Sequence, residues 1–140
     1  MAVLFGANTA PRSTTPAGLV DGSLQGGHVR VYREKITLTG QTTADTITLA
    51  LPSNGESFLL GVLTSDVSLG LAQVSIGSAA APAKYRALAV HTAPDTPTLF
   101  GRAATQGVKL TADETVILTI STANLPVGGT LIVDLYFTQT

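Results

Sequence analysis

The stretch Thr130-Leu-Ile-Val-Asp-Leu-Tyr-Phe-Thr138 decides the fold of this chain. Leu, Val, Leu and Phe recur in it at every second position, and successive side chains of a β-strand point to opposite faces of a sheet. Residues 115–121 repeat the same alternation. The apolar side chains expected on the buried faces of these two strands are Val116, Leu118, Ile120, Leu131, Val133, Leu135 and Phe137.

The connection between these two segments, residues 124–129, has the sequence Asn-Leu-Pro-Val-Gly-Gly. We expect the two strands to form a long hairpin joined by this connection. Its six residues make it longer than the two-residue loops of tight hairpins. Gly128 and Gly129 can supply positive φ angles where the second strand begins.

Further strands are predicted upstream, each followed by Pro, Gly or Asn signals for a turn or loop. In residues 28–38 the apolar parity switches near Arg33 to Lys35, which predicts a β-bulge or a strand that passes between two environments. Gly61 leaves room for a bulge or a close neighbour. Residues 85–90 would also suit a short helix, and we predict a strand there. The remaining predicted strands are residues 46–51, 58–62, 69–76 and 98–100.

Seven or eight strands and no helix predict an all-β fold. We expect a single-domain antiparallel β-sandwich over residues 28–140, with the jelly roll as the closest match. Residues 1–27 are rich in Pro and Gly and almost free of charge, so they predict an extended N-terminal arm or, alternatively, a disordered tail. The arm carries apolar side chains, and we expect it to dock on a neighbouring subunit.

Only 12% of the 140 residues are charged, about half the usual share, while 44% are hydrophobic. A surface with so few charges repels its neighbours weakly, which favours assembly; a monomer with a threonine-coated surface is the alternative. The formal net charge of −1 argues against direct binding of nucleic acid or of an acidic membrane. No cysteine is present, and we see neither a secretion signal nor a membrane anchor.

No cluster of residues predicts catalysis, a cofactor or a metal ion. His28 and His91 are far apart in the sequence, and we expect both at the surface. Asp113-Glu114 lacks the second acidic segment of a calcium loop, which indicates solvated turn residues. Ser65 and Ser75 lack the flanking glycines of a nucleophile elbow. We therefore expect no enzymatic activity.

Arg30, Arg33 and Lys35 form the basic cluster of the sequence. Alternation along a strand places Arg33 and Lys35 on one face and Arg30 on the other. Cations divided between two faces neutralise few phosphates, so we interpret these residues as partners in ion pairs between subunits.

Three segments carry a resemblance to a known group of proteins: Met1 to Thr9, Val31 to Leu38 and Leu125 to Phe137. Together they resemble small structural proteins of tailed bacteriophages, most of all the capsid decoration, or cement, proteins. The resemblance implies a jelly-roll domain that forms a homotrimer on the outer surface of the phage head. It also implies a terminal arm that reaches the major capsid protein, so that capsomers are bridged and the shell is stabilised.

The resemblance transfers no functional residue, because no motif for shell binding is matched. From the residues themselves we expect the contacts with the capsid and with other subunits at Val3, Leu4, Phe5, Arg12, Leu19, Val20, Arg30, Arg33 and Lys35. Two other functions are kept open. One is a receptor-binding module of a phage tail or head fibre that recognises host glycans, and the other is a small β-barrel enzyme or ligand carrier.

Overall fold

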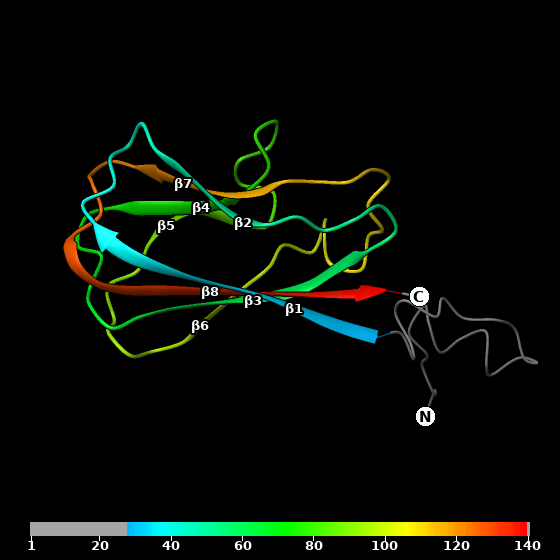
Figure 1. Ribbon diagram of the computed structural model, residues 1–140, viewed down its shortest axis with the longest axis horizontal. Coiled ribbons are helices and arrows are strands. Elements are labelled where there is room, and N and C mark those ends of the chain that lie inside the picture. Colours follow the sequence, from blue (N-terminus) through cyan, green and yellow to red (C-terminus); the bar gives the residue numbers. More distant parts are fainter. Residues whose placement is uncertain (1–27, 140) are drawn as a thin grey trace, which may run out of the picture.

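The protein is a sandwich of two four-stranded antiparallel sheets (Figure 1). The computed structural model describes residues 28–139, and the predicted arm, residues 1–27, lies outside the described residues. No helix occurs within residues 28–139. The strands are β1 (His28–Thr39), β2 (Thr46–Ala50), β3 (Ser57–Ser65), β4 (Gln73–Gly77), β5 (Arg86–Val90), β6 (Thr98–Phe100), β7 (Val116–Ser121) and β8 (Val127–Gln139).

The strand order is that of a jelly roll. One sheet, here sheet A, has the order β1-β8-β3-β6, and the other, sheet B, has the order β2-β7-β4-β5. Every connection along the chain passes from one sheet to the other, except the one from β4 to β5. Eight strands arranged in this way form two Greek keys. The prediction of an all-β antiparallel sandwich of jelly-roll type is therefore confirmed.

The predicted hairpin between the last two strands is wrong. β7 lies in sheet B between β2 and β4, whereas β8 lies in sheet A between β1 and β3. The alternating pattern of each strand shows which side chains are buried, but it does not show which strand lies alongside. Gly128 and Gly129 do adopt positive φ angles, 92° and 96°, but they lie among the first residues of β8 and not in a hairpin loop.

The core lies between the two sheets and is built from the alternating side chains that the sequence predicted. Sheet A contributes Phe58 and Phe137, whose ring centroids are 5.6 Å apart. Sheet B contributes aliphatic side chains, and Tyr85 packs against Phe58 with a centroid distance of 4.5 Å. Leu118, Leu131, Val133, Leu135 and Phe137 are each fully buried.

The pairing of β1 and of β3 with β8 decides which side chains of sheet A point outward. Of the two alternatives predicted near Arg33 to Lys35, the bulge is wrong, because β1 pairs with β8 without a break from His28 to Thr37; β1 instead passes from an exposed to a buried environment. Val29 and Val31 therefore face outward instead of joining the core. In β3 the register shifts between Phe58 and Leu60, so Phe58 points inward and Leu60 outward.

Gly61 illustrates why a glycine lies within β3. A Cβ atom at this position would lie 2.1 Å from Cζ of Phe100, so only glycine lets the Phe100 ring cross the strand. Phe100 belongs to β6, and its ring stacks near Phe58 at a centroid distance of 6.4 Å. The predicted close neighbour of Gly61 is thus confirmed.

Candidate interaction surface

The outward side of sheet A carries an unusual concentration of apolar side chains. Because the register of each strand pair is known, residues directly opposite one another share a face. Val31 lies opposite Tyr136, and Tyr136 lies opposite Leu60. In the next row Arg33, Asp134, Val62 and Leu99 follow one another across all four strands. We call the set Val29, Val31, Leu60, Val62, Leu99 and Tyr136 the outer apolar face.

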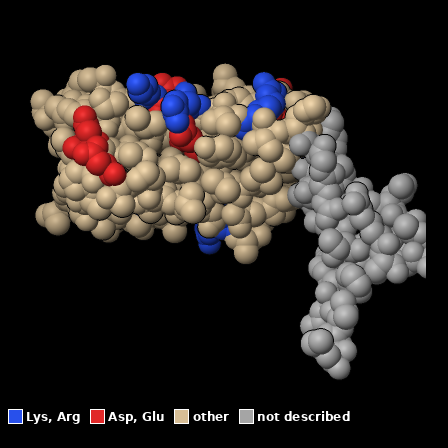
Figure 2. All heavy atoms as spheres, turned by 90° about the horizontal axis from the view of Figure 1, so that it is seen from below, with Lys and Arg blue, Asp and Glu red and all other residues tan. Residues whose placement is uncertain are grey.

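The outer apolar face is accessible among the described residues. Val29, Val31 and Leu99 are 56%, 51% and 71% exposed, and the other members are half-buried. Figure 2 shows the molecule from the side of sheet A: most of the visible surface is neither basic nor acidic, and most charged side chains lie along the upper margin and at the left end, with one basic group at the lower margin. A contiguous apolar surface on a sheet marks an interaction site more often than an isolated exposed side chain does.

One ion pair is set into this face. Arg33 Nε and Nη2 donate to the two carboxylate oxygens of Asp134 at 2.7 and 2.8 Å. The hydrogen bonds and the charge of Asp134 raise the pKa of the Arg33 guanidinium. The two-pronged geometry neutralises both charges on the same surface, so the ion pair adds no net charge to the outer apolar face.

The predicted division of the basic cluster is confirmed. Arg33 and Lys35 lie on the outward side of β1, whereas Arg30 shares the opposite parity with Tyr32 and reaches Glu56. Both arginines find their carboxylates within the same chain, a pairing that the sequence interpretation assigned to other subunits. Their role in subunit contacts stays a prediction. Val3, Leu4, Phe5, Arg12, Leu19 and Val20 lie outside the described residues.

The outward side of sheet B has a different chemistry. Thr46, Thr119 and Ser75 form one row across it, and Thr48 and Ile117 begin the next. The strands β2, β4 and β7 contain no charged residue. The threonines of this side present hydroxyl groups that carry no charge, Ser75 is buried, and apolar side chains are confined to Ile117 and the edge strand β5, where Val90 is 46% exposed.

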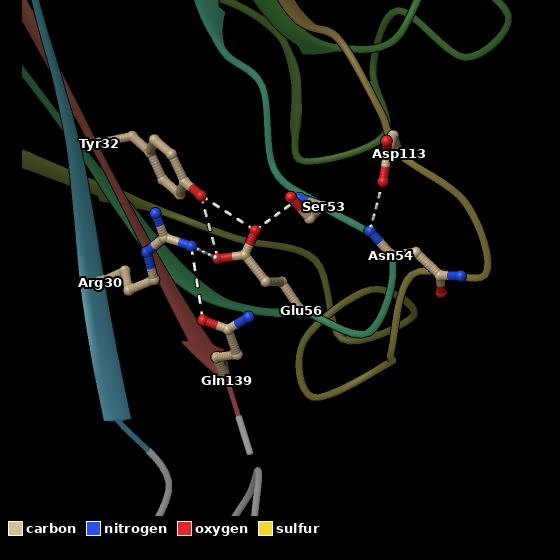
Figure 3. Close-up of polar contacts among 7 residues, drawn as sticks. All are labelled: Arg30, Tyr32, Ser53, Asn54, Glu56, Asp113 and Gln139. Carbon is tan, nitrogen blue, oxygen red and sulfur yellow. Dashed lines mark hydrogen bonds and ion pairs between the residues drawn. The ribbon is translucent and has the colours of Figure 1, made fainter.

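A buried carboxylate anchors the end of the sandwich at which β1 begins and β8 finishes (Figure 3). Glu56 is fully buried just before β3 and accepts hydrogen bonds from Tyr32 Oη at 2.9 and 3.0 Å. It also accepts from the Ser53 backbone N–H at 2.5 Å and from Arg30 Nη1 at 3.3 Å.

The donors around Glu56 satisfy both of its carboxylate oxygens. Burial and the hydrogen bond to Glu56 raise the pKa of Tyr32. Arg30 Nη1 also donates to Gln139 Oε1 at 3.4 Å, so the same contacts link both ends of the described chain. This network therefore holds the start of β1, from which the arm departs, and no donor or acceptor in it points to an absent ligand.

His91 was expected at the surface, and this prediction is wrong. Only 4% of His91 is exposed, because the loop from β5 to β6 folds it under the edge of the sandwich. Its Nδ1 lies 3.4 Å from Thr98 Oγ1, and its Nε2 has no partner among the described residues. Burial, and then the charge of Arg86, lower the pKa of His91.

Arg86 occupies the irregular part of β5. Its guanidinium donates to the carbonyl oxygens of Val74, Ala89 and Val90, and two residues of β5 lie opposite the single residue Ser75 of β4. Burial lowers the pKa of Arg86. The buried side chain thus links carbonyl groups of β4 and β5 at the point where the pairing of the two strands is irregular.

A pocket of ≈ 340 Å³ lies beside Lys84, Tyr85 and Glu114. Lys84 Nζ and Tyr85 Oη each lie 2.5 Å from an oxygen of Glu114, so the predicted solvated position of Glu114 is wrong. Burial and this hydrogen bond raise the pKa of Tyr85, so its phenol stays protonated and donates to Glu114. The polar groups of this trio satisfy one another, and the geometry offers no activated nucleophile.

The described residues contain no group of three His, Cys, Asp or Glu side chains placed to hold a metal ion. No helix within residues 28–139 has the length and apolar character needed to cross a bilayer. Of the surfaces described here, the outer apolar face is the candidate for function.

Three solved structures share the fold of this chain. A chain of the cyanophage Pam1 capsid asymmetric unit superimposes with a TM-score of 0.64 at 19% identity, covering 81% of this chain and 86% of that one. A chain of the Ralstonia phage GP4 capsid gives 0.63 at 16% identity with the same two coverages, 81% and 86%. A chain of the acid-stable capsid of Helicobacter pylori bacteriophage KHP30 gives 0.59 at 10% identity, covering 79% and 86%. No protein-family model and no curated protein matches the sequence.

Proposed function

We propose that this chain is a non-enzymatic structural protein of a tailed bacteriophage, and that it decorates the outer surface of the head as a cement protein. It binds the major capsid protein and other copies of itself, most simply as a homotrimer. The observation that carries the proposal is the jelly roll shared with chains of three phage capsids over about four fifths of both partners.

The surface chemistry supports an assembled protein. An apolar surface that stays in water is costly, and burying it against a partner is worth roughly 25 cal/mol per Å². The outer apolar face offers such a surface on a rigid sheet, with its one embedded ion pair already neutralised. A cement protein makes several contacts at once, so each further contact forms at high effective concentration and moderate interfaces are sufficient.

The number of copies in purified virions tests the proposal. We expect quantitative mass spectrometry to find on the order of hundreds of copies per particle, because a cement protein follows the symmetry of the shell. A tail-tip or fibre module would be present in a handful of copies, and that result would contradict the decoration role. Absence from virions would overturn the virion assignment altogether.

Deletion of residues 1–27 tests the role of the arm in attachment. We expect the truncated chain to keep a folded body, because the core and the Glu56 network lie within residues 28–139. It should bind shells that lack the protein more weakly than the full chain does. Equal binding by both chains, measured by co-sedimentation with the shells, would show that the arm makes no contribution.

A further inference from the structure

The outer apolar face raises the question of what covers it. Val31 on β1 and Leu99 on β6 lie on the two edge strands of sheet A, and Tyr136, Leu60 and Val62 lie between them. The face is therefore a shallow apolar strip that crosses the whole sheet. On the outward side of sheet B the middle strands carry threonines, and apolar side chains are confined to Ile117 and the edge strand β5, so no comparable strip crosses sheet B.

The chain itself contains a segment that matches this strip. Residues 1–27 carry two charged residues, Arg12 and Asp21, and begin with the apolar cluster Val3-Leu4-Phe5. This segment enters β1 at His28, directly beside Val29 of the outer apolar face. Phe5 is the kind of aromatic anchor that dominates binding energy in protein interfaces.

The length of the segment allows it to reach its own face or that of another copy, and the direction in which β1 begins distinguishes the two. Fully extended, the residues between Phe5 and His28 span roughly 75 Å, whereas the 13 residues of β8 span roughly 43 Å. The segment leaves β1 at the end of the sandwich, so it must reverse direction to cover its own sheet. The face of another copy at that end lies within reach without such a reversal.

We propose that the outer apolar face of one copy binds the cluster Val3-Leu4-Phe5 of another copy. The exchange joins copies of the chain through their N-terminal segments. It involves no capsid protein, so it is tested with the isolated protein, and its failure would leave the copy number in virions unaffected.

Disulfide cross-linking tests the proposal, because the chain has no cysteine of its own. One full-length variant carries Leu4→Cys, and a second carries Leu99→Cys on the exposed β6 strand. The matched control carries Thr48→Cys, which is exposed on the outward side of sheet B. Each face variant is mixed with Leu4→Cys under mild oxidation, and the mixed dimer is measured on non-reducing gels.

We expect the pair Leu4→Cys and Leu99→Cys to cross-link about tenfold faster than the pair with Thr48→Cys, because docking raises the effective concentration of the two thiols. Equal rates for the two pairs would overturn the proposal. A chain that carries both Leu4→Cys and Leu99→Cys tests the alternative of self-docking. If it forms only an internal disulfide while the mixed pair forms none, the arm covers its own face and the exchange is wrong.

Sedimentation velocity provides a second test that needs no cysteine and does not depend on the efficiency of oxidation. We expect Leu99→Asp and deletion of residues 1–5 to weaken self-association in sedimentation velocity, and the double variant to be no weaker than either single one. Additive losses would show that the two regions act on separate contacts, which would overturn the proposal.

Discussion

The two sheets of the sandwich differ more on their outward sides than their shared fold suggests. On the outward side of sheet B, Thr46, Thr48 and Thr119 present hydroxyl groups, and the exposed apolar side chains belong to the edge strand β5. Sheet A presents the outer apolar face, with one neutralised ion pair set into it. A low content of charge is thus found on two kinds of surface. On sheet B the uncharged surface is rich in threonine hydroxyl groups, and on sheet A it is apolar and suited to burial.

The inward sides also differ, and this gives the largest expected effect. Phe137 of sheet A has edge-to-face contacts with Tyr32 at 5.6 Å and with Tyr85 at 6.1 Å. Leu118 of sheet B is buried to the same extent but packs among aliphatic side chains. We expect Phe137→Ala to lower the free energy of unfolding by about 4 kcal/mol and Leu118→Ala by about 3 kcal/mol. Urea unfolding of both variants measures the difference, and a larger loss for Leu118→Ala would contradict an aromatic centre in sheet A.

The next effect concerns the anchor that ties sheet A to the connection from β2. In Glu56→Gln, an amide N–H₂ replaces an oxygen that accepts hydrogen bonds, so two donors face each other in a buried place. We expect a loss of about 2 kcal/mol in the free energy of unfolding. Asp113→Asn is the matched control, because Asp113 is exposed and accepts a single hydrogen bond from the Asn54 backbone at 2.9 Å. Equal losses in the two variants would show that burial of Glu56 does not matter.

The strands could be predicted from the sequence because alternation is a local property. Residues 98–100 and 115–121 coincide with β6 and β7 to within one residue. The partner of each strand could not be predicted in the same way, and the expected hairpin at residues 124–129 is wrong for that reason. A six-residue connection can join two neighbouring strands of one sheet or cross from one sheet to the other, and its sequence does not distinguish the two cases.

Only part of the candidate surface could be predicted from the sequence. The split of Arg33 and Lys35 from Arg30 follows from strand parity and is confirmed. The outer apolar face was missed, because its members come from β1, β3, β6 and β8 and meet only through the register. The parity of Val29 and Val31 was the available signal, and it was interpreted as a bulge or as a strand that passes between two environments.

A smaller effect is expected at His91, in the loop that carries the chain from sheet B to sheet A. Burial lowers its pKa in the folded state below the value of about 6.5 found in unfolded chains. As the pH falls below about 6.5, the unfolded chain therefore takes up this proton first, and the folded state loses stability.

The test compares urea unfolding at pH 7 and pH 5. We expect the wild-type chain to lose stability through this group between pH 7 and pH 5, and His91→Gln to remove that part of the loss. His28→Gln is the control, because His28 is exposed at the start of β1. A steeper pH dependence in His91→Gln than in the wild type would show that the sign is wrong.

The smallest effect on stability addresses the comparison most directly, because it exchanges the chemistry of the two outward sides. Leu99→Thr gives sheet A a hydroxyl, and Thr48→Leu gives sheet B an apolar side chain at an exposed position. Both sites are on the surface, so each variant should stay within about 0.5 kcal/mol of the wild-type free energy of unfolding. Self-association, measured by sedimentation velocity, should fall in Leu99→Thr and stay unchanged or rise in Thr48→Leu. If both variants associate like the wild type, exposed apolar area on sheet A is not what brings copies together, and the difference between the two sides has no role in assembly.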